Sequence, residues 1–224
     1  MKLSKYVKLV KSCGYCAVIH VAGSGIWLGT PNAVFRATEL PEMEGEDQVR
    51  TVLDMTEKAW EKVYLKESYA ESIRNIFGMN LSEFEEGEQK TEKIKVLAVH
   101  KGVWATGLRC ANDGEIIFYN EALTAPFAEE IKNGEYITYT VRKTSAGQRY
   151  VVLHNGFDVL AAIMPMQIIT QEYLADLAEF QALCTEQFYR EKQRAEVAAA
   201  LAEQDAEPEE EAEQIGMEDN ADAD

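Results

Sequence analysis

The part of the sequence that decides the fold runs from Tyr136 to Met166 and reads YITYTV (136–141), RYVVLH (149–154) and FDVLAAIMPM (157–166). The three runs are rich in β-branched and aromatic residues, and Asn155-Gly156 between the last two is typical of a tight hairpin. The third run is apolar almost without interruption until Pro165, which places it in the middle of a packed sheet. The stretch therefore predicts an antiparallel meander.

The residues before this meander have a related pattern. Strands are predicted at 94–100, 103–110 and 115–119, because β-rich runs are separated there by glycine-containing turns. A helix is predicted over 121–132, because Asn133-Gly134 is a typical helix end. This half of the body, residues 93–168, thus combines strands and one helix.

The first half, residues 1–80, repeats that order without repeating the sequence. Residues 1–12 predict a short helix, because apolar residues recur on one face and lysines on the other. The predicted elements that follow are strands at 15–22, 26–29, 33–38 and 49–54, a helix over 54–67, and a helical continuation within 68–77. The polar, acidic residues 78–92 predict a linker between the two halves.

The C-terminal part of the chain has a different composition. Tyr173, Leu177, Phe180, Cys184 and Phe188 recur at helical spacing, which predicts an amphipathic helix within 169–202 whose first four turns pack on the body or on a second subunit. Residues 203–224 contain eleven acids, no base and no aromatic residue. That composition predicts a disordered acidic tail.

Composition limits the class of protein. The net charge is −17, but residues 1–202 hold 22 bases against 28 acids, so the body is only mildly acidic. No apolar run approaches the roughly 20 residues of a membrane-spanning helix, and the run 16–22 is too short for a secretory signal. Four cysteines without regular spacing are typical of a reducing compartment, so we expect a cytoplasmic protein without a membrane partner.

The sequence contains no recognisable catalytic constellation. Cys13 and Cys16 form a CxxC, but a predicted helix precedes it and a strand follows, the reverse of a redox site, and no second ligand pair completes a zinc site. His20, His100 and His154 each fall in or at the end of a strand, without a nucleophile motif. We expect no catalytic residue, metal or cofactor, and the alternative of an enzyme with an unrecognised site ranks last.

Two rows of lysines are the candidate functional residues. One row recurs every third residue in the N-terminal helix and has no interleaved acid, whereas the other recurs every fourth residue in the helix predicted over 54–67, beside Glu57 and Glu61. A row of ammonium groups on one helix face can contact a phosphate backbone. A self-paired, solvated surface is the alternative for the second row. The DNA-contact candidates are Lys2, Lys5, Lys8, Lys11, Lys58, Lys62 and Lys66.

The order of elements resembles one domain of a DNA sliding clamp, the processivity factor of replicative polymerases. The residues that carry the resemblance are the lysine-bearing N-terminal helix, GIWLGT (25–30) followed by AVFRA (33–37), and a short strand at 52–53 before a lysine-bearing helix. The most specific stretch is DVLAAIMPM (158–166), which is similar to the closing strand of bacterial clamps. The resemblance covers residues 1–168.

The resemblance implies a pseudo-twofold domain with helices inside and antiparallel sheets outside. It implies that helix lysines contact double-stranded DNA without reading its sequence, that edge strands pair between subunits, and that replication proteins are partners. This chain departs from the pattern in three respects. It has room for one such domain only, its helix over 121–132 carries Glu129 and Glu130, and the helix after residue 169 has no counterpart.

The expected fold class is therefore α+β: antiparallel sheets with a few packed helices in a pseudo-twofold clamp-like domain, a long C-terminal helix and an acidic tail. The leading functional hypothesis is a non-catalytic, DNA-associated scaffold, a replication accessory factor that contacts phosphates non-specifically and assembles as a homo-oligomer. The alternative is a protein–protein interaction module of the same fold with no DNA role, acting through the C-terminal helix and the tail.

Overall fold

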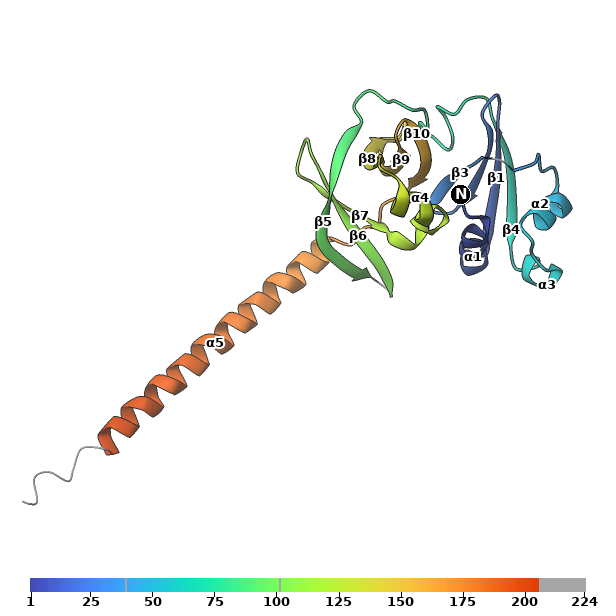
Figure 1. The fold of residues 1–224 in the computed structure, drawn as a ribbon. Helices are drawn as coiled ribbons and strands as arrows, with labels where there is room; N and C mark the ends of the chain where they lie inside the picture. Colours follow the sequence, from blue (N-terminus) through green and yellow to red (C-terminus); the bar gives the residue numbers. More distant parts are fainter. Residues whose placement is uncertain (39, 101, 206–224) are drawn as a thin grey trace, which may run out of the picture. The chain divides into compact units, whose positions relative to one another are not determined.

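The structure is a computed structural model that describes residues 1–38, 40–100 and 102–205. It consists of two compact units, residues 1–168 and residues 169–224. The first unit is α+β with a large mixed sheet, and the second contains one long helix, so the predicted α+β class and the C-terminal helix are confirmed (Figure 1). The predicted disorder of the acidic tail falls, from residue 206 on, outside the described residues.

The N-terminal helix and the three strands after it form as predicted. Tyr6, Val7 and Val10 are the buried residues of α1, as the apolar stripe requires. Gly14 ends the helix with a φ of 65°, a left-handed conformation that glycine adopts without strain. These elements are α1 (Leu3–Cys13), β1 (Tyr15–Val21), β2 (Gly25–Thr30) and β3 (Ala33–Ala37).

The segment between residues 46 and 77 differs from the prediction. The residues predicted as a strand at 49–54 lie mostly in helix α2 (Glu46–Val52). The predicted helix over 54–67 is wrong, because α3 (Glu57–Trp60) has only four residues and β4 (Tyr64–Ala70) follows it. Residues 64–70, which include Tyr64 and Tyr69, pair with β1, and that tertiary pairing overrides the helical spacing.

The predicted helical continuation within 68–77 is also wrong. β4 runs to Ala70, and Ile76 and Met79 then pair across a tight turn, with Phe77 and Gly78 both at positive φ. Two consecutive residues at positive φ are the requirement of the hairpin turn of type I′. The following residues, predicted as a linker, contribute to a buried cluster through Met79 and Leu81, so they form part of the packed body.

The second half follows the predicted order. Asn120 caps the helical segment by accepting a hydrogen bond from the backbone N–H of Ala122, and this segment begins as a 3-10 helix that contains Pro126. β10 lies between β3 and β9, as its apolar sequence predicts. The elements are β5 (Gln89–His100), β6 (Val103–Cys110), β7 (Ile116–Asn120), η1 (Glu121–Phe127), α4 (Ala128–Asn133), β8 (Ile137–Lys143), β9 (Arg149–Asn155) and β10 (Asp158–Ile163).

The ten strands form one sheet in the order β4-β1-β2-β3-β10-β9-β8-β5-β6-β7. At its centre, β3 pairs antiparallel with β10, and each of these strands is the last of a three-stranded meander that follows a helical segment. α1 precedes one meander and η1 with α4 precedes the other. The two meanders, with the helical segments before them, therefore have an approximate twofold arrangement about the antiparallel β3–β10 pair. The outer strands depart from it, because β4 pairs parallel with β1 whereas β5 pairs antiparallel with β8.

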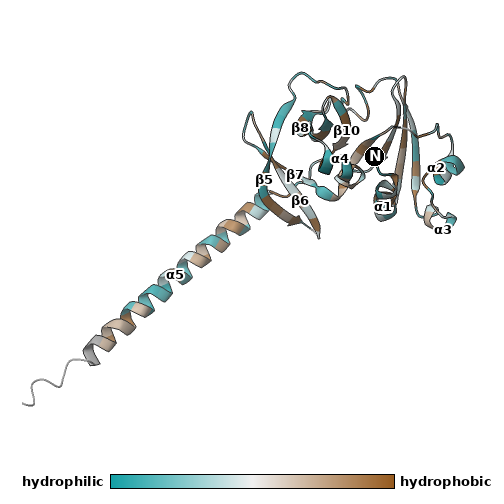
Figure 2. Ribbon diagram, viewed as in Figure 1, coloured by the Kyte–Doolittle hydropathy of each residue, from teal (hydrophilic) through white to brown (hydrophobic). Residues whose placement is uncertain are grey.

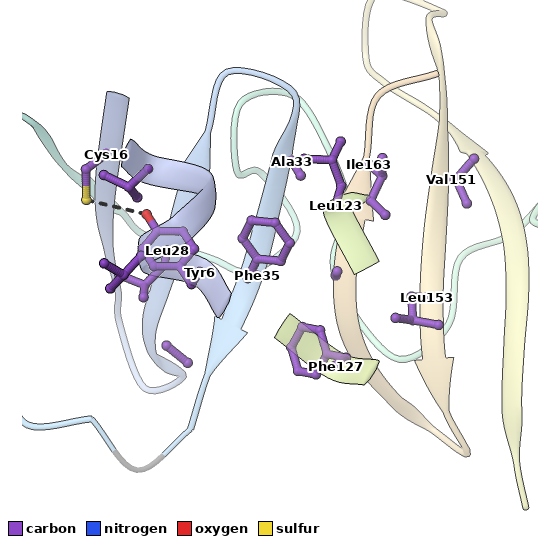
Figure 3. Close-up of a cluster of buried hydrophobic side chains, with 14 of the residues drawn as sticks. Tyr6, Cys16, Leu28, Ala33, Phe35, Leu123, Phe127, Val151, Leu153 and Ile163 are labelled. Carbon is purple, nitrogen blue, oxygen red and sulfur yellow. Dashed lines mark hydrogen bonds between the residues drawn. The ribbon is translucent and has the colours of Figure 1, made fainter. Parts of the chain in front are cut away.

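Both faces of the central part of the sheet are buried, by two clusters whose residues alternate along β1, β2, β3, β9 and β10. Tyr6 of α1 and Phe127 of η1 pack on one face, on either side of Phe35 from β3 (Figure 3). The backbone N–H of Lys2 donates to the carbonyl of Pro126, which joins the two helical segments directly. The other face is covered by Ile76, Met79 and Leu81. α1 and η1 therefore lie side by side on the same face.

The second unit contains α5 (Gln171–Asp205), which confirms the predicted C-terminal helix. Every residue from 171 to 202 is exposed, including the large apolar ones, and Figure 2 shows apolar and polar residues alternating along it. Among the described residues, no helix is long and apolar enough to cross a membrane.

Candidate functional site

The first lysine row lies on the outer side of α1, because Tyr6, Val7 and Val10 occupy the inner side. Its N-terminal end is neutralised by α4: Lys2 forms an ion pair with Glu129, and the amino group of Met1 lies 2.9 Å from a carboxylate oxygen of Glu130. The hydrogen bond and charge of Lys2 lower the pKa of Glu129. This end of the helix is therefore close to electrically neutral.

The other end of α1 keeps its positive charge. Lys8 and Lys11 are exposed, and neither forms an ion pair with the part of the chain that the structure describes. Lys5 is half-buried and contributes to the lowered pKa of Glu129. Among the described residues, the row therefore contains two lysines that are both exposed and without an ion pair, Lys8 and Lys11.

The second lysine row is divided by the fold. Lys58 lies in α3, Lys62 lies in the turn after it, and Lys66 lies in β4, so the predicted single helix face does not exist. Lys66 pairs with Ala17, whose side chain belongs to the buried cluster on the sheet face opposite α1. Its ammonium nitrogen lies 5.0 Å from the centre of the Phe77 ring. Lys66 is therefore separated from the lysines of α1.

Lys62 is brought to the end of α1. The backbone N–H of Tyr64 donates to the carbonyl of Gly14, and a Cβ atom on Gly14 would lie 3.1 Å from the carbonyl oxygen of Lys62. The turn that carries Lys62 thus packs against the last residue of the helix. We call Lys8 and Lys11 of α1, together with Lys62 of the adjoining turn, the basic end.

A buried polar cluster on the opposite face was not predicted. Arg142 of β8 is 1% exposed, and its guanidinium donates to the carbonyls of Asn80 and Ser82, each at 2.8 Å, and to Glu88 at 2.8 Å. Nε2 of His154 lies 2.9 Å from the other carboxylate oxygen of Glu88. We call Arg142, Glu88 and His154 the clasp, because it fixes residues 80–88 to the sheet.

The electrostatics of the clasp follow from its hydrogen bonds. Burial alone raises the pKa of Glu88, but the hydrogen bonds from His154 and Arg142 outweigh it and lower that pKa to about 2. Arg142 directly follows the run 136–141 that was predicted as a strand, and it continues the alternation of Thr138 and Thr140, so its place on the same face of the sheet could have been extrapolated. A charge at such a position requires partners, which sequence alone does not identify.

The other sequence candidates do not converge. Cys13 is exposed, whereas Cys16 is buried, and burial raises the pKa of the Cys16 thiol to about 11. This thiol is therefore protonated at neutral pH and unsuited to thiolate exchange. His20 stacks on Tyr69, His154 belongs to the clasp, and His100 ends β5. Within the described residues, no group of three or more His, Cys, Asp or Glu side chains is arranged to hold a metal ion.

Comparisons with models of protein families, with curated proteins and with solved structures found no match for this chain. The functional argument therefore rests on the geometry of the basic end, the sheet and α5.

Proposed function

We propose that this chain is a non-catalytic, clamp-like scaffold that associates with double-stranded DNA and contacts phosphates without reading base sequence. The observation that carries the proposal is the approximate twofold arrangement of unit 1. Two helical segments lie side by side on one face of a continuous sheet, and the exposed lysines of α1 point away from that sheet. The resemblance to sliding clamps implies this arrangement, and replication proteins are then the expected partners.

The proposed contact is electrostatic and weak. Among the candidate lysines, we place the phosphate contacts at the three of the basic end, because α4 neutralises the start of α1 and Lys66 lies away from that helix. Each neutralised phosphate releases counterions, so three contacts give a slope of about −3 in a plot of log affinity against log salt. Contacts of this kind carry no sequence information and are compatible with movement along the duplex.

Assembly of several copies is part of the same proposal. β4 is an edge of the sheet, paired on one side with β1, and Tyr64 and Tyr69 on it are 66% and 74% exposed. An edge strand offers unpaired backbone groups to another chain. Pairing of such edges between copies supports a homo-oligomer that surrounds or lines DNA, and a single copy is too small to do so.

The test measures retention of a short DNA duplex by fluorescence anisotropy as a function of salt. The Lys8→Glu/Lys11→Glu double variant should remove the salt-sensitive binding, because two of three phosphate contacts become repulsive. The matched control is Lys66→Glu/Lys192→Glu, which reverses two exposed lysines elsewhere in the chain. Equal loss in both variants, or undiminished binding in the first, would contradict the role of the basic end.

A second candidate function is a protein–protein interaction module with no DNA role. The exposed apolar residues of α5 favour it, since a helix of this kind normally buries that surface against a partner. The same titration separates the two functions. A folded wild-type protein that does not bind the duplex even at low salt would favour the interaction module.

A further inference from the structure

α5 presents an apolar stripe with no partner among the described residues. Its residues recur every three or four positions, and Tyr173, Leu177, Phe180 and Phe188 are 46%, 45%, 65% and 63% exposed. Such spacing places side chains on one side of a helix. The same spacing continues with Glu191 and then with three alanines. The stripe consists of Tyr173, Leu177, Phe180, Cys184, Phe188, Glu191, Ala195, Ala198 and Ala202.

The sizes of the stripe residues indicate what covers them. The first half of the stripe is bulky and the last part is alanine, so a second copy in the reverse direction fits large residues against small ones. Tyr173, Leu177 and Phe180 then face Ala202, Ala198 and Ala195 of the other copy, in that order. A copy in the same direction would set bulky residues against each other and Glu191 against its own equivalent. Facing side chains of unequal size interdigitate, which favours the reverse direction.

The charges of α5 favour the same direction. Residues 171–187 contain four acids and no base, whereas residues 188–202 contain three bases and two acids. Two of the bases already form pairs within the helix, Arg190 with Glu186 at 2.6 Å and Lys192 with Glu196 at 3.9 Å, and Arg194 forms none among the described residues. Reverse pairing brings the acidic half of one helix beside the basic half of the other, and opposite charges beside a helical seam select orientation.

We propose that α5 associates with α5 of a second copy of this chain as an antiparallel pair centred near Phe188, with the apolar stripe as the seam. The inference rests on the second candidate function and identifies the partner as the chain itself. It does not depend on DNA binding. By chain connectivity, the two N-terminal units leave the pair at opposite ends.

Analytical ultracentrifugation of the full chain tests the pairing. The wild type should dimerise, and Leu177→Glu/Phe180→Glu should raise the dimer dissociation constant by about 100-fold or more, because charges would be placed in the seam. The control Ala175→Glu/Ala182→Glu adds the same charges on the opposite side of the helix. Its dimer dissociation constant should stay within about threefold of the wild-type value. The inference is overturned if the wild type is a monomer at all concentrations, or if the control variant loses dimerisation as much as Leu177→Glu/Phe180→Glu does.

Disulfide trapping tests the direction, in chains carrying Cys13→Ser and Cys184→Ala. A chain with Leu177→Cys mixed with a chain with Ala198→Cys should form the mixed disulfide in preference to either symmetric one. Symmetric cross-linking of the Leu177→Cys chain alone, at a higher yield than the mixture, overturns the antiparallel direction. These readouts need no nucleic acid, so failure here is distinct from failure of the DNA proposal.

Discussion

At the scale of single residues, the clasp is the most constrained part of unit 1. Arg142 is almost completely buried, and its Nη2 donates to Glu88 while its Nη1 donates to the carbonyls of Asn80 and Ser82. A buried charge without partners costs several kcal/mol, so the four groups depend on one another. The clasp therefore explains why a polar, acidic segment without regular secondary structure lies fixed on the sheet.

The clasp makes a prediction for acid stability. The pKa of Glu88 lies at about 2 in the folded protein, below its ordinary value of 4.5, so ionised Glu88 stabilises the fold by about 3 kcal/mol above pH 4.5. This contribution is lost as the pH falls from 4.5 toward 2. Glu88→Gln should lower the urea midpoint at pH 7 and reduce its fall between pH 5 and pH 3.

The matched control for this prediction is Glu86→Gln, which removes the charge of an exposed glutamate two residues away. It should change stability by less than about 0.5 kcal/mol and leave the pH dependence of the wild type in place. An identical pH profile for wild type and Glu88→Gln would show that Glu88 does not ionise in the clasp.

At the scale of elements, the sequence predicted the helices and strands whose formation depends on neighbouring residues. The apolar run of β10, the hairpin at Asn155-Gly156 and the inner side of α1 all follow from residues close in the chain. The prediction of a helix over 54–67 was wrong for a physical reason. Ala59, Trp60, Val63 and Tyr64 have helical spacing, yet Tyr64 is exposed and extends beside β1, and nothing local encodes a parallel partner more than 40 residues away.

The central position of β10 can be tested with one substitution. Ile163 is fully buried between β3 and β9, so Ile163→Asp places an unpaired carboxylate in the core and should destabilise the protein by several kcal/mol. Ile163→Val, which removes one methyl group, should cost about 1 kcal/mol. Urea denaturation followed by tryptophan fluorescence measures both. Similar midpoints for the two variants would contradict a central, packed strand.

At the scale of the whole molecule, the candidate site could not be predicted without the fold. The lysine row of α1 could be predicted from the spacing of its residues. The neutralisation of Lys2 could not, because Lys2 and Glu129 are 127 residues apart in sequence. The basic end likewise depends on the turn that places Lys62 beside Gly14. Ion pairing therefore neutralises part of the lysine row of α1, and the basic end is what remains of the two predicted rows near that helix.

The last prediction concerns the independence of the two units. Both buried clusters consist entirely of residues within 1–168, so the core of unit 1 is complete without α5. A chain ending at residue 168 should fold, with a melting temperature within a few degrees of the full chain at low protein concentration. It should sediment as a monomer where the full chain dimerises, because the seam has been removed. A fall in melting temperature beyond about 8 °C, the shift that about 2–4 kcal/mol produces in a domain of this size, would mean that residues after 168 complete the core.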